Sequence, residues 1–310
     1  MDPYIIIAVT NPRACIDKSN SGLPDSGALD GITAFINNLL GEPDMQNVNH
    51  FELCNEPNIA IYYDENEKKL KYTGDTKDER TSVYTAKGKA YGKICEKMID
   101  AIRAKRGDSA EIGILSLCGI DSRFDKDGSR YIWNGRYCAD NFVKGALDYL
   151  SDPNGDGSKA DTKLNDVDVI TYHPYSYLVN PEVISERDLT GVTDIAKTYG
   201  MNTANAWHTE FGWSTAKYPA NSACIGDDYV QAKNIIRQYA SMYTRNNDDK
   251  LFIYDFIDDD IVTNAQESNY GLIHSELYST PYAAKLSYLA VSNLNKMTAG
   301  LANAEFAYNT

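Results

Sequence analysis

The stretch that most constrains the fold is residues 47–58, NVNHFELCNEPN. Its first part, Val48–Leu53, is a short alternating run of the kind that forms a buried β-strand. Pro57 must end this strand, because proline cannot donate to the hydrogen-bond ladder of a central strand. Glu56 is therefore predicted to lie at the C-terminal end of a strand, where α/β barrels carry their reacting groups.

A second glutamate has the same setting. Residues 204–213, ANAWHTEFGW, are another short apolar run and carry Glu210 just before Phe211-Gly212. In a barrel, the ends of two such strands can meet across one mouth. Two facing carboxylates are the groups that hydrolyse a glycosidic bond. The alternative is a pair of solvated glutamates in loops.

Strands and helices alternate along the rest of the chain, which predicts βαβ units and a parallel sheet. No internal repeat or low-complexity linker interrupts residues 1–310, so we expect a single domain. The predicted strands are Tyr4–Thr10, Val48–Leu53, Glu111–Leu117, Val167–Tyr172, the strand carrying Glu210, and Leu251–Phe256. The predicted helices are Ser26–Leu40, Ser82–Lys105, Asn141–Leu150, Val192–Tyr199, Asp227–Thr244 and Thr280–Leu294.

These motifs resemble those of the clan A glycoside hydrolases, and most of all family 39 and related uncharacterised members. Asn55-Glu56-Pro57 resembles the end of strand four, and Thr209–Trp213, TEFGW, resembles the end of strand seven. His173-Pro174-Tyr175 resembles the end of strand six, and Glu267–Leu272, ESNYGL, the turn before the last helix. The resemblance implies a TIM-type (β/α)8 barrel in which Glu56 is the acid/base and Glu210 the nucleophile of a retaining hydrolase.

The chain departs from this pattern in its strand count. It shows about six βα units, whereas a closed barrel of this type has eight. Strands one and two have no counterpart, and neither has the strand-two arginine that supports the nucleophile in the family. We therefore expect an N-terminally incomplete barrel. A second copy of the chain is expected to cover its open edge, unless the strands close into a smaller barrel.

Three residues are predicted to bind the sugar beside the catalytic pair. By resemblance, Asn55 bonds the sugar 2-hydroxyl, and its alternative role is to satisfy backbone groups at the strand end. His173 and Tyr175 line the sugar site by the same resemblance, and the Tyr175 hydroxyl can donate to Glu210 and keep it ionised. The alternative for His173 is a satisfied core histidine.

Aromatic and buried polar residues complete the predicted site. Trp213 is a candidate for stacking on a sugar ring, with core packing as the equal alternative. Many relatives carry a Trp platform on strand eight, but here Ile253 lies near that position and Tyr254 is the substitute. Strand alternation points Glu52 and His208 inward with the catalytic pair, where they are expected to support it without reacting.

Residues 152–157, DPNGDG, resemble the start of a calcium loop with Asp152, Asn154 and Asp156 as ligands. The twelfth position, which should be an acid, is Lys163. A turn rich in Asx side chains is the alternative, and we predict no metal. The six cysteines have neither zinc-ligand nor disulfide-scaffold spacing.

The formal net charge of −14 disfavours nucleic acid and anionic membrane as partners but not a neutral sugar polymer. We find no membrane span and no signal peptide, and expect an extracellular or cell-surface protein whose signal lies upstream. The leading hypothesis is a retaining β-glycoside hydrolase that acts on a polysaccharide or oligosaccharide and needs no cofactor. The rivals are a non-catalytic carbohydrate-binding protein and an assembly module on a degenerate barrel.

Overall fold

The computed structural model describes most of the chain, and the statements below refer to the described part. It comprises residues 3–9, 28–60, 62–63, 69–70, 77–118, 122–124, 130–132, 139–175, 181, 192–201, 205–216, 225–243, 250–259 and 265–299. Most of the connection at 62–80 and the cysteines at 15, 138 and 224 lie outside it.

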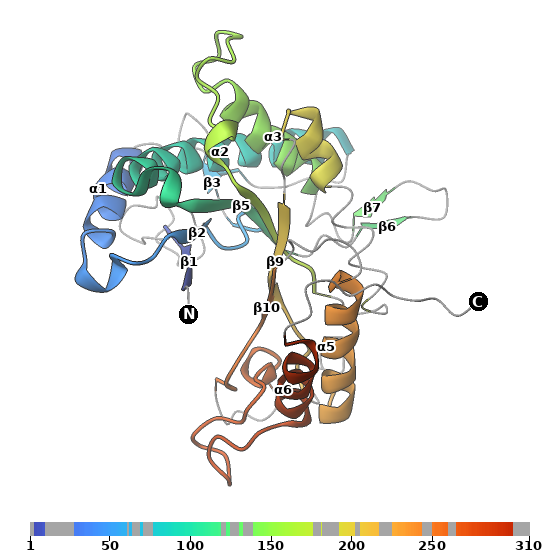
Figure 1. The fold of residues 1–310 in the computed structure, drawn as a ribbon. Coiled ribbons are helices and arrows are strands. Elements are labelled where there is room, and N and C mark those ends of the chain that lie inside the picture. Colours follow the sequence, from blue (N-terminus) through green and yellow to red (C-terminus); the bar gives the residue numbers. More distant parts are fainter. Residues whose placement is uncertain are drawn as a thin grey trace. The chain divides into compact units, whose positions relative to one another are not determined.

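Strands and helices alternate as the sequence predicts (Figure 1). The main sheet contains β1 (Tyr4–Ile7), β2 (His50–Leu53), β5 (Glu111–Cys118), β8 (Val169–His173), β9 (Asn205–Phe211) and β10 (Leu251–Ile253). The helices are α1 (Leu29–Leu39), α2 (Lys77–Arg106), α3 (Ala139–Ser151), α5 (Asp228–Tyr243) and α6 (Leu286–Thr298), with a further helical stretch at 192–198. Two short hairpins pair β3 (Tyr62–Tyr63) with β4 (Lys69–Leu70) and β6 (Ser122–Phe124) with β7 (Arg130–Ile132).

The strand order of the main sheet is β1-β2-β5-β8-β9-β10. The pairs β1/β2, β2/β5 and β9/β10 are parallel, as strands joined by helical crossovers must be. Six strands that alternate with helices in this way confirm the predicted α/β class and match partial TIM-type barrels. Among the described helices, none is both long enough and apolar enough to cross a membrane.

The chain divides into two compact units. Unit 1 comprises Met1–Tyr172 and Thr190–Ala206, and unit 2 comprises His173–Leu189 and Trp207–Thr310. The boundaries fall inside β8 and β9, so each of these strands begins in unit 1 and ends in unit 2. The expected single domain over residues 1–310 stays a prediction.

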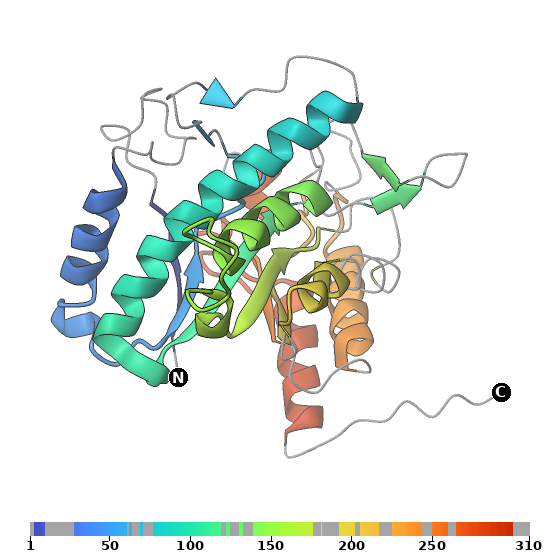
Figure 2. The ribbon, with the colours of Figure 1, turned by 90° about the horizontal axis from the view of Figure 1, so that it is seen from above.

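In unit 1, helices α1, α2 and α3 lie on the same side of strands β1, β2 and β5 (Figures 1 and 2). The close contact of α2 with α3 depends on glycine. A Cβ on Gly88 would lie 2.1 Å from the Phe142 carbonyl oxygen, and one on Gly145 would lie 2.2 Å from that of Thr85. Buried aromatic side chains fill the space beneath, with the Tyr91 and Phe142 rings 5.4 Å apart.

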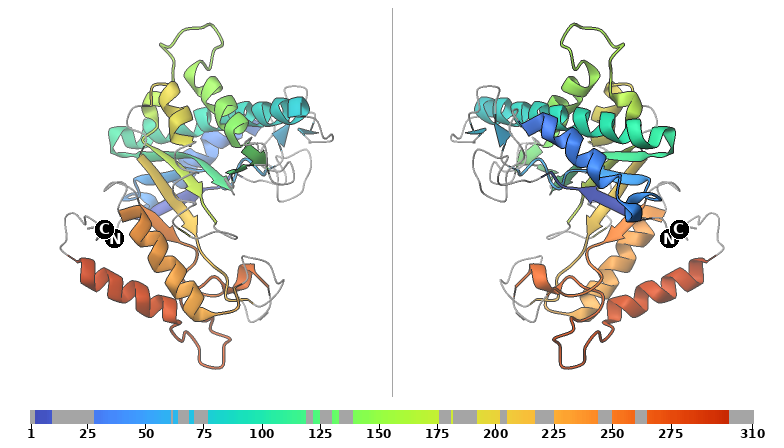
Figure 3. Two further views of the ribbon diagram at one scale, coloured as in Figure 1. Left: turned by 90° about the vertical axis from the view of Figure 1, so that its right-hand side faces the viewer. Right: turned by 90° about the vertical axis from the view of Figure 1, so that its left-hand side faces the viewer.

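In unit 2, α5 and α6 pack against the β9–β10 pair (Figure 3). The core of this unit is an apolar cluster to which β9, α5 and α6 each contribute. Its buried members are Phe211, Trp213, Ile235, Leu272 and Val291, and Ile253 of β10 packs against them. Burial of this cluster fixes the ends of β9 and β10, from which the candidate site is built.

Candidate active site

Glu56 follows β2 in unit 1, in a backbone that is bent away from strand geometry. Cys54 and Glu56 have φ values of 69° and 44°, a region that residues other than glycine seldom adopt. Such strained residues cluster at functional sites, where the surrounding structure holds them in place. The Cys54 amide still donates to the Ile7 carbonyl at 3.1 Å, so the hydrogen bonds between β1 and β2 continue up to the residue at which the bend begins. Pro57 follows, as predicted, and Glu56 is half-buried while Asn55 is exposed.

Asn58 fastens this bend to the end of β5. Its side-chain amide donates to the Cys118 carbonyl, and its side-chain oxygen accepts from the Cys118 amide, both at 2.9 Å. Tyr91 adds a second link, because its hydroxyl donates to the Leu53 carbonyl at 3.0 Å and accepts from the Leu115 amide at 2.8 Å. Asn58 thus satisfies backbone groups at the end of β5.

Glu52 is fully buried in β2 and interacts with Tyr4 of β1. Burial, the nearby charge of Glu52 and a hydrogen bond to it raise the pKa of Tyr4. Tyr4 is thus a partner of Glu52 that the motifs do not reveal. Burial also raises the pKa of the neighbouring Cys54 thiol to about 12, so this thiol stays protonated and inert.

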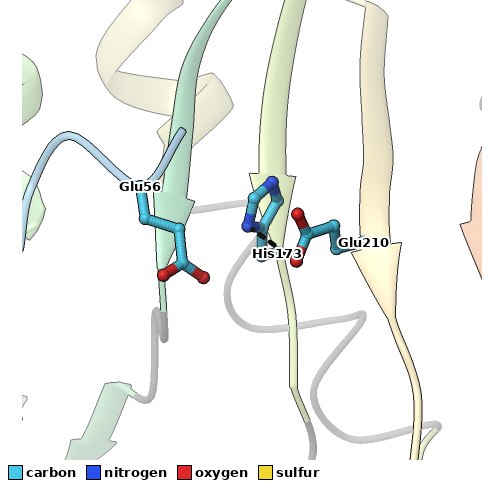
Figure 4. A group of neighbouring side chains, drawn as sticks. All are labelled: Glu56, His173 and Glu210. Carbon is cyan, nitrogen blue, oxygen red and sulfur yellow. Dashed lines mark ion pairs between the residues drawn. The ribbon is translucent and has the colours of Figure 1, made fainter. Parts of the chain in front are cut away.

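Glu210 lies near the end of β9 in unit 2, with two polar neighbours at the end of β8. The Tyr175 hydroxyl donates to Glu210 Oε2 at 2.9 Å, and His173 Nδ1 lies 3.4 Å from the same oxygen. Figure 4 draws the His173–Glu210 pair with a dashed line and also labels Glu56. His173 is fully buried, whereas the Glu210 side chain keeps 17% of its surface exposed. The carboxylate is therefore held on one side and reachable from the other.

Three tyrosines gather beside Glu210. Tyr254 meets Tyr270 edge-on at 5.4 Å and Tyr175 at 6.5 Å, and Tyr175 meets Tyr270 at 5.8 Å. Burial and the surrounding carboxylates raise the pKa of Tyr254 to about 12. Gly212 lets the end of β9 lie close to the Tyr254 backbone, because a Cβ on this glycine would lie 2.1 Å from the Tyr254 carbonyl oxygen. Tyr175 and Tyr254, both predicted to border the sugar, are thus brought together beside Glu210 within unit 2.

Asp255, Asp258 and Asp259 follow Tyr254 shortly after the end of β10. Burial, and then the charges of Asp259 and Asp258, raise the pKa of Asp255 to about 7. Asp258 is buried and forms an ion pair of 2.6 Å with the buried Lys285. These residues form no recognisable sequence motif, because a lysine just before a surface helix carries no sign that it is buried.

Trp213 and His208 are both buried in unit 2. Trp213 is only 2% exposed and packs edge-on against Phe211 in the unit 2 core, so its ring offers no face to a sugar. This position fits the core-packing alternative for Trp213. His208 is fully buried and lies 3.3 Å from the Gln238 side-chain nitrogen of α5.

The loop at 152–157 has the hydrogen bonds of an Asx-rich turn. The Asp152 carboxylate accepts from the backbone amides of Asp156 and Gly157, and Asn154 donates to Asp161. Lys163, at the twelfth position, pairs with Asp100 at 2.6 Å. It therefore places a cation where a calcium loop needs a carboxylate.

Comparison with known proteins gives a match at the level of structure. No protein-family model matches the chain, and no curated protein matches it in sequence. Among solved structures, the chain is similar to a family 39 glycoside hydrolase from Bacteroides cellulosilyticus WH2 with a TM-score of 0.54 and 15% identity. This match covers 94% of this chain and 50% of the other. A monomeric beta-xylosidase from Caulobacter crescentus CB15 gives a TM-score of 0.53 and 18% identity over 94% and 52% of the two chains.

The chain shares the fold of the family 39 glycoside hydrolases. A glucosidase from Croceicoccus marinus also matches, with a TM-score of 0.52 and 13% identity over 88% and 48% of the two chains. The chain thus spans about half the length of the structures it matches. At these identities the likeness concerns the fold, which is the glycosidase-like partial barrel that the motifs predicted.

Proposed function

We propose that this chain is a retaining β-glycoside hydrolase acting on a polysaccharide or oligosaccharide. The observation that carries the proposal is the setting of Glu210. Glu210 lies near the end of a buried parallel strand, and its carboxylate accepts a hydrogen bond from Tyr175 and remains partly exposed. A donor aimed at a carboxylate favours its charged form, which a nucleophile needs. The shared fold of solved glycoside hydrolases supports the same class of reaction.

In the proposed reaction Glu210 attacks the anomeric carbon while Glu56 protonates the leaving oxygen, which breaks the glycosidic bond. Glu56 then takes a proton from water, and the hydroxide formed displaces Glu210 from the covalent intermediate. Asn55 is proposed to bond the sugar 2-hydroxyl, and Tyr175 and Tyr254 to border the sugar. This chemistry requires the two carboxyl groups to lie about 5–5.5 Å apart when substrate is bound.

The proposal also covers the setting of the reaction. The partner is a neutral carbohydrate, for which the net charge of −14 is no obstacle. The reaction needs no cofactor, because both proton transfer and nucleophilic attack come from carboxyl groups. A polymeric substrate fits an extracellular or cell-surface location, which we propose as well.

Two substrates of different leaving-group acidity test the roles of the glutamates. Glu210→Gln should abolish hydrolysis of both a nitrophenyl glycoside and the matching oligosaccharide. Glu56→Gln should abolish hydrolysis of the oligosaccharide but keep formation of the glycosyl-enzyme from the nitrophenyl glycoside, whose leaving group needs little protonation. Burst kinetics separate these steps. Glu42→Gln, at an exposed glutamate of unit 1, is the matched control.

Full activity of Glu210→Gln would contradict the proposal. Binding of the glycan without turnover by the unaltered protein would favour the rival reading of a non-catalytic carbohydrate-binding protein. If the protein binds neither the glycan nor its fragments, the result would favour an assembly module.

A further inference from the structure

A loop in unit 2 presents two tyrosine rings to solvent just before α6. Tyr278 is 44% exposed and Tyr282 is 52% exposed. We call this pair the tyrosine platform. The side chains of Glu276, Ser279 and Thr280 and the apolar side chain of Leu277 are exposed around it. Exposed rings are common on proteins, so the significance of these two depends on how they are held.

Tyr278 is fixed from below by a buried polar chain. Its ring stacks on His274 with centroids 3.8 Å apart and planes 8° from parallel. His274 Nδ1 lies 3.2 Å from Asp258 Oδ2, and Asp258 Oδ1 pairs with Lys285 Nζ at 2.6 Å. Lys285 is fully buried and also donates to the Thr215 hydroxyl at 3.1 Å. A surface ring is thus tied to a buried ion pair, which limits its rotation.

Tyr282 is held by its backbone and by its hydroxyl. Its φ of 56° is rare for a bulky residue. Its hydroxyl donates to Glu276 Oε2 at 3.1 Å, and this hydrogen bond raises the pKa of Tyr282. The backbone amides of Tyr278 and Tyr282 both donate to the Ser275 carbonyl at 3.3 Å. These hydrogen bonds to one carbonyl hold the backbone of the loop that carries both rings.

We propose that the tyrosine platform is a carbohydrate-binding site separate from the Glu210 site. A fixed aromatic face stacks on the apolar face of a pyranose ring, and neighbouring carboxylate and hydroxyl groups bond its hydroxyls. Pre-ordered rings lose little freedom when a ligand binds, which favours binding to a flexible polymer.

The surroundings of the platform favour a neutral sugar chain over a protein partner. The central part of a protein interface is depleted in charge, whereas Glu276 accepts from one platform tyrosine and is itself exposed. The net charge of −14 disfavours anionic ligands. The proposal goes beyond the proposed hydrolase, because a platform of this kind would hold a polysaccharide whether or not the chain cleaves it.

Binding is measured by retardation in native gels that contain soluble xylan or mixed-linkage β-glucan. The proteins carry Glu210→Gln, so that hydrolysis does not remove the polysaccharide during the run. We expect Tyr278→Ala and Tyr282→Ala each to raise the apparent Kd for at least one of the two polysaccharides by roughly tenfold, the effect of losing one main contact residue. Tyr229→Ala is the matched control, since Tyr229 on α5 is 64% exposed and outside the platform.

The same substitutions in the Glu210-containing protein separate this proposal from the proposed function. If the chain is a hydrolase, Tyr278→Ala should leave cleavage of a short nitrophenyl glycoside unchanged. If the chain is not a hydrolase, the gel measurement still shows whether the tyrosine platform binds polysaccharide. Equal retardation of the platform variants and the unaltered protein, or no retardation of any of them, would overturn the proposal. So would self-association that Tyr278→Ala abolishes, because the platform would then bind a second copy.

Discussion

At the scale of single residues, the polar neighbours of Glu210 determine how this carboxylate behaves. Tyr175 donates to it at 2.9 Å, and the imidazole of His173 lies 3.4 Å from the same oxygen. Hydrogen bonds to a charged acceptor contribute roughly 1.5–3 kcal/mol. The Tyr175 hydroxyl therefore stabilises the ionised carboxylate that the proposed reaction needs.

Removal of that hydroxyl gives a prediction with a defined sign. Tyr175→Phe should lower kcat/KM by roughly ten- to a hundredfold, because one hydrogen bond to a charged group is lost. The acid limb of the pH–activity profile should also move to higher pH, since the Glu210 carboxylate is then easier to protonate. The measurement is kcat/KM for a nitrophenyl glycoside across the acid range.

Tyr199→Phe serves as the control for loss of a tyrosine hydroxyl. Tyr199 bonds Asp148 at 2.6 Å on the surface of unit 1, and its variant should keep the unaltered profile. A Tyr175→Phe profile that falls in rate without moving along the pH axis would show that the hydroxyl only shapes the site.

The positions of the motif residues were predictable, because these residues lie at strand ends. The side chains that bond to them were harder to predict. The contact of Tyr175 with Glu210 follows from two adjacent strands that end at one edge. Asn58, Tyr91 and Tyr4 were missed because each bonds the backbone or side chain of a different strand, and nothing in their local sequence shows this. Trp213 was ambiguous, because a ring just after a strand can face either the core or the ligand.

At the scale of helices and strands, the apolar pattern located each predicted element but not its ends. Helix α2 begins at Lys77, before the predicted Ser82, because its polar first turns show no apolar stripe. Helix α6 begins at Leu286 instead of Thr280. The preceding residues instead form a loop in which Ile273 pairs with Ala284 and Tyr282 adopts a positive φ. Tertiary contacts of Lys285 with Asp258 and Thr215 favour that loop over the helix.

The glycines between α2 and α3 give a prediction at this scale. A Cβ on Gly145 would lie 2.2 Å from the Thr85 carbonyl oxygen, which is backbone and cannot turn aside. Gly145→Ala should therefore force the helices apart and lower the free energy of unfolding by about 1–3 kcal/mol, as overpacking does. Urea denaturation followed by circular dichroism measures the change.

Gly31→Ala is the matched control, because it makes the same substitution on an exposed face of α1. A Cβ on Gly31 meets nothing within 4 Å. The higher helix propensity of alanine should then raise the free energy of unfolding by up to about 1 kcal/mol. Equal effects of the two substitutions would mean that the contact of α2 with α3 does not require glycine.

At the scale of the whole molecule, the sheet places β1 at one end of its strand order. Ile5 and Ile6 of this strand are only half-buried, although the run is apolar enough to be covered on both sides. An edge strand presents unpaired amide and carbonyl groups that invite another strand, and proteins normally cover such edges. Exposed apolar surface adds a cost of about 25 cal/mol per Å². Both effects favour an additional partner at β1.

We expect a second copy of the chain to cover this edge. Sedimentation velocity should then show a dimer whose fraction rises with concentration, with little binding of a hydrophobic dye. Amide exchange at Tyr4–Ile7 should slow as the dimer forms, because a partner strand would bond the outward-facing amides of β1. Dye binding with irregular aggregation would indicate an open edge. A monomer at every concentration that binds no dye, with exchange at Tyr4–Ile7 independent of concentration, would contradict the dimer. It would favour closure of the strands into a smaller barrel.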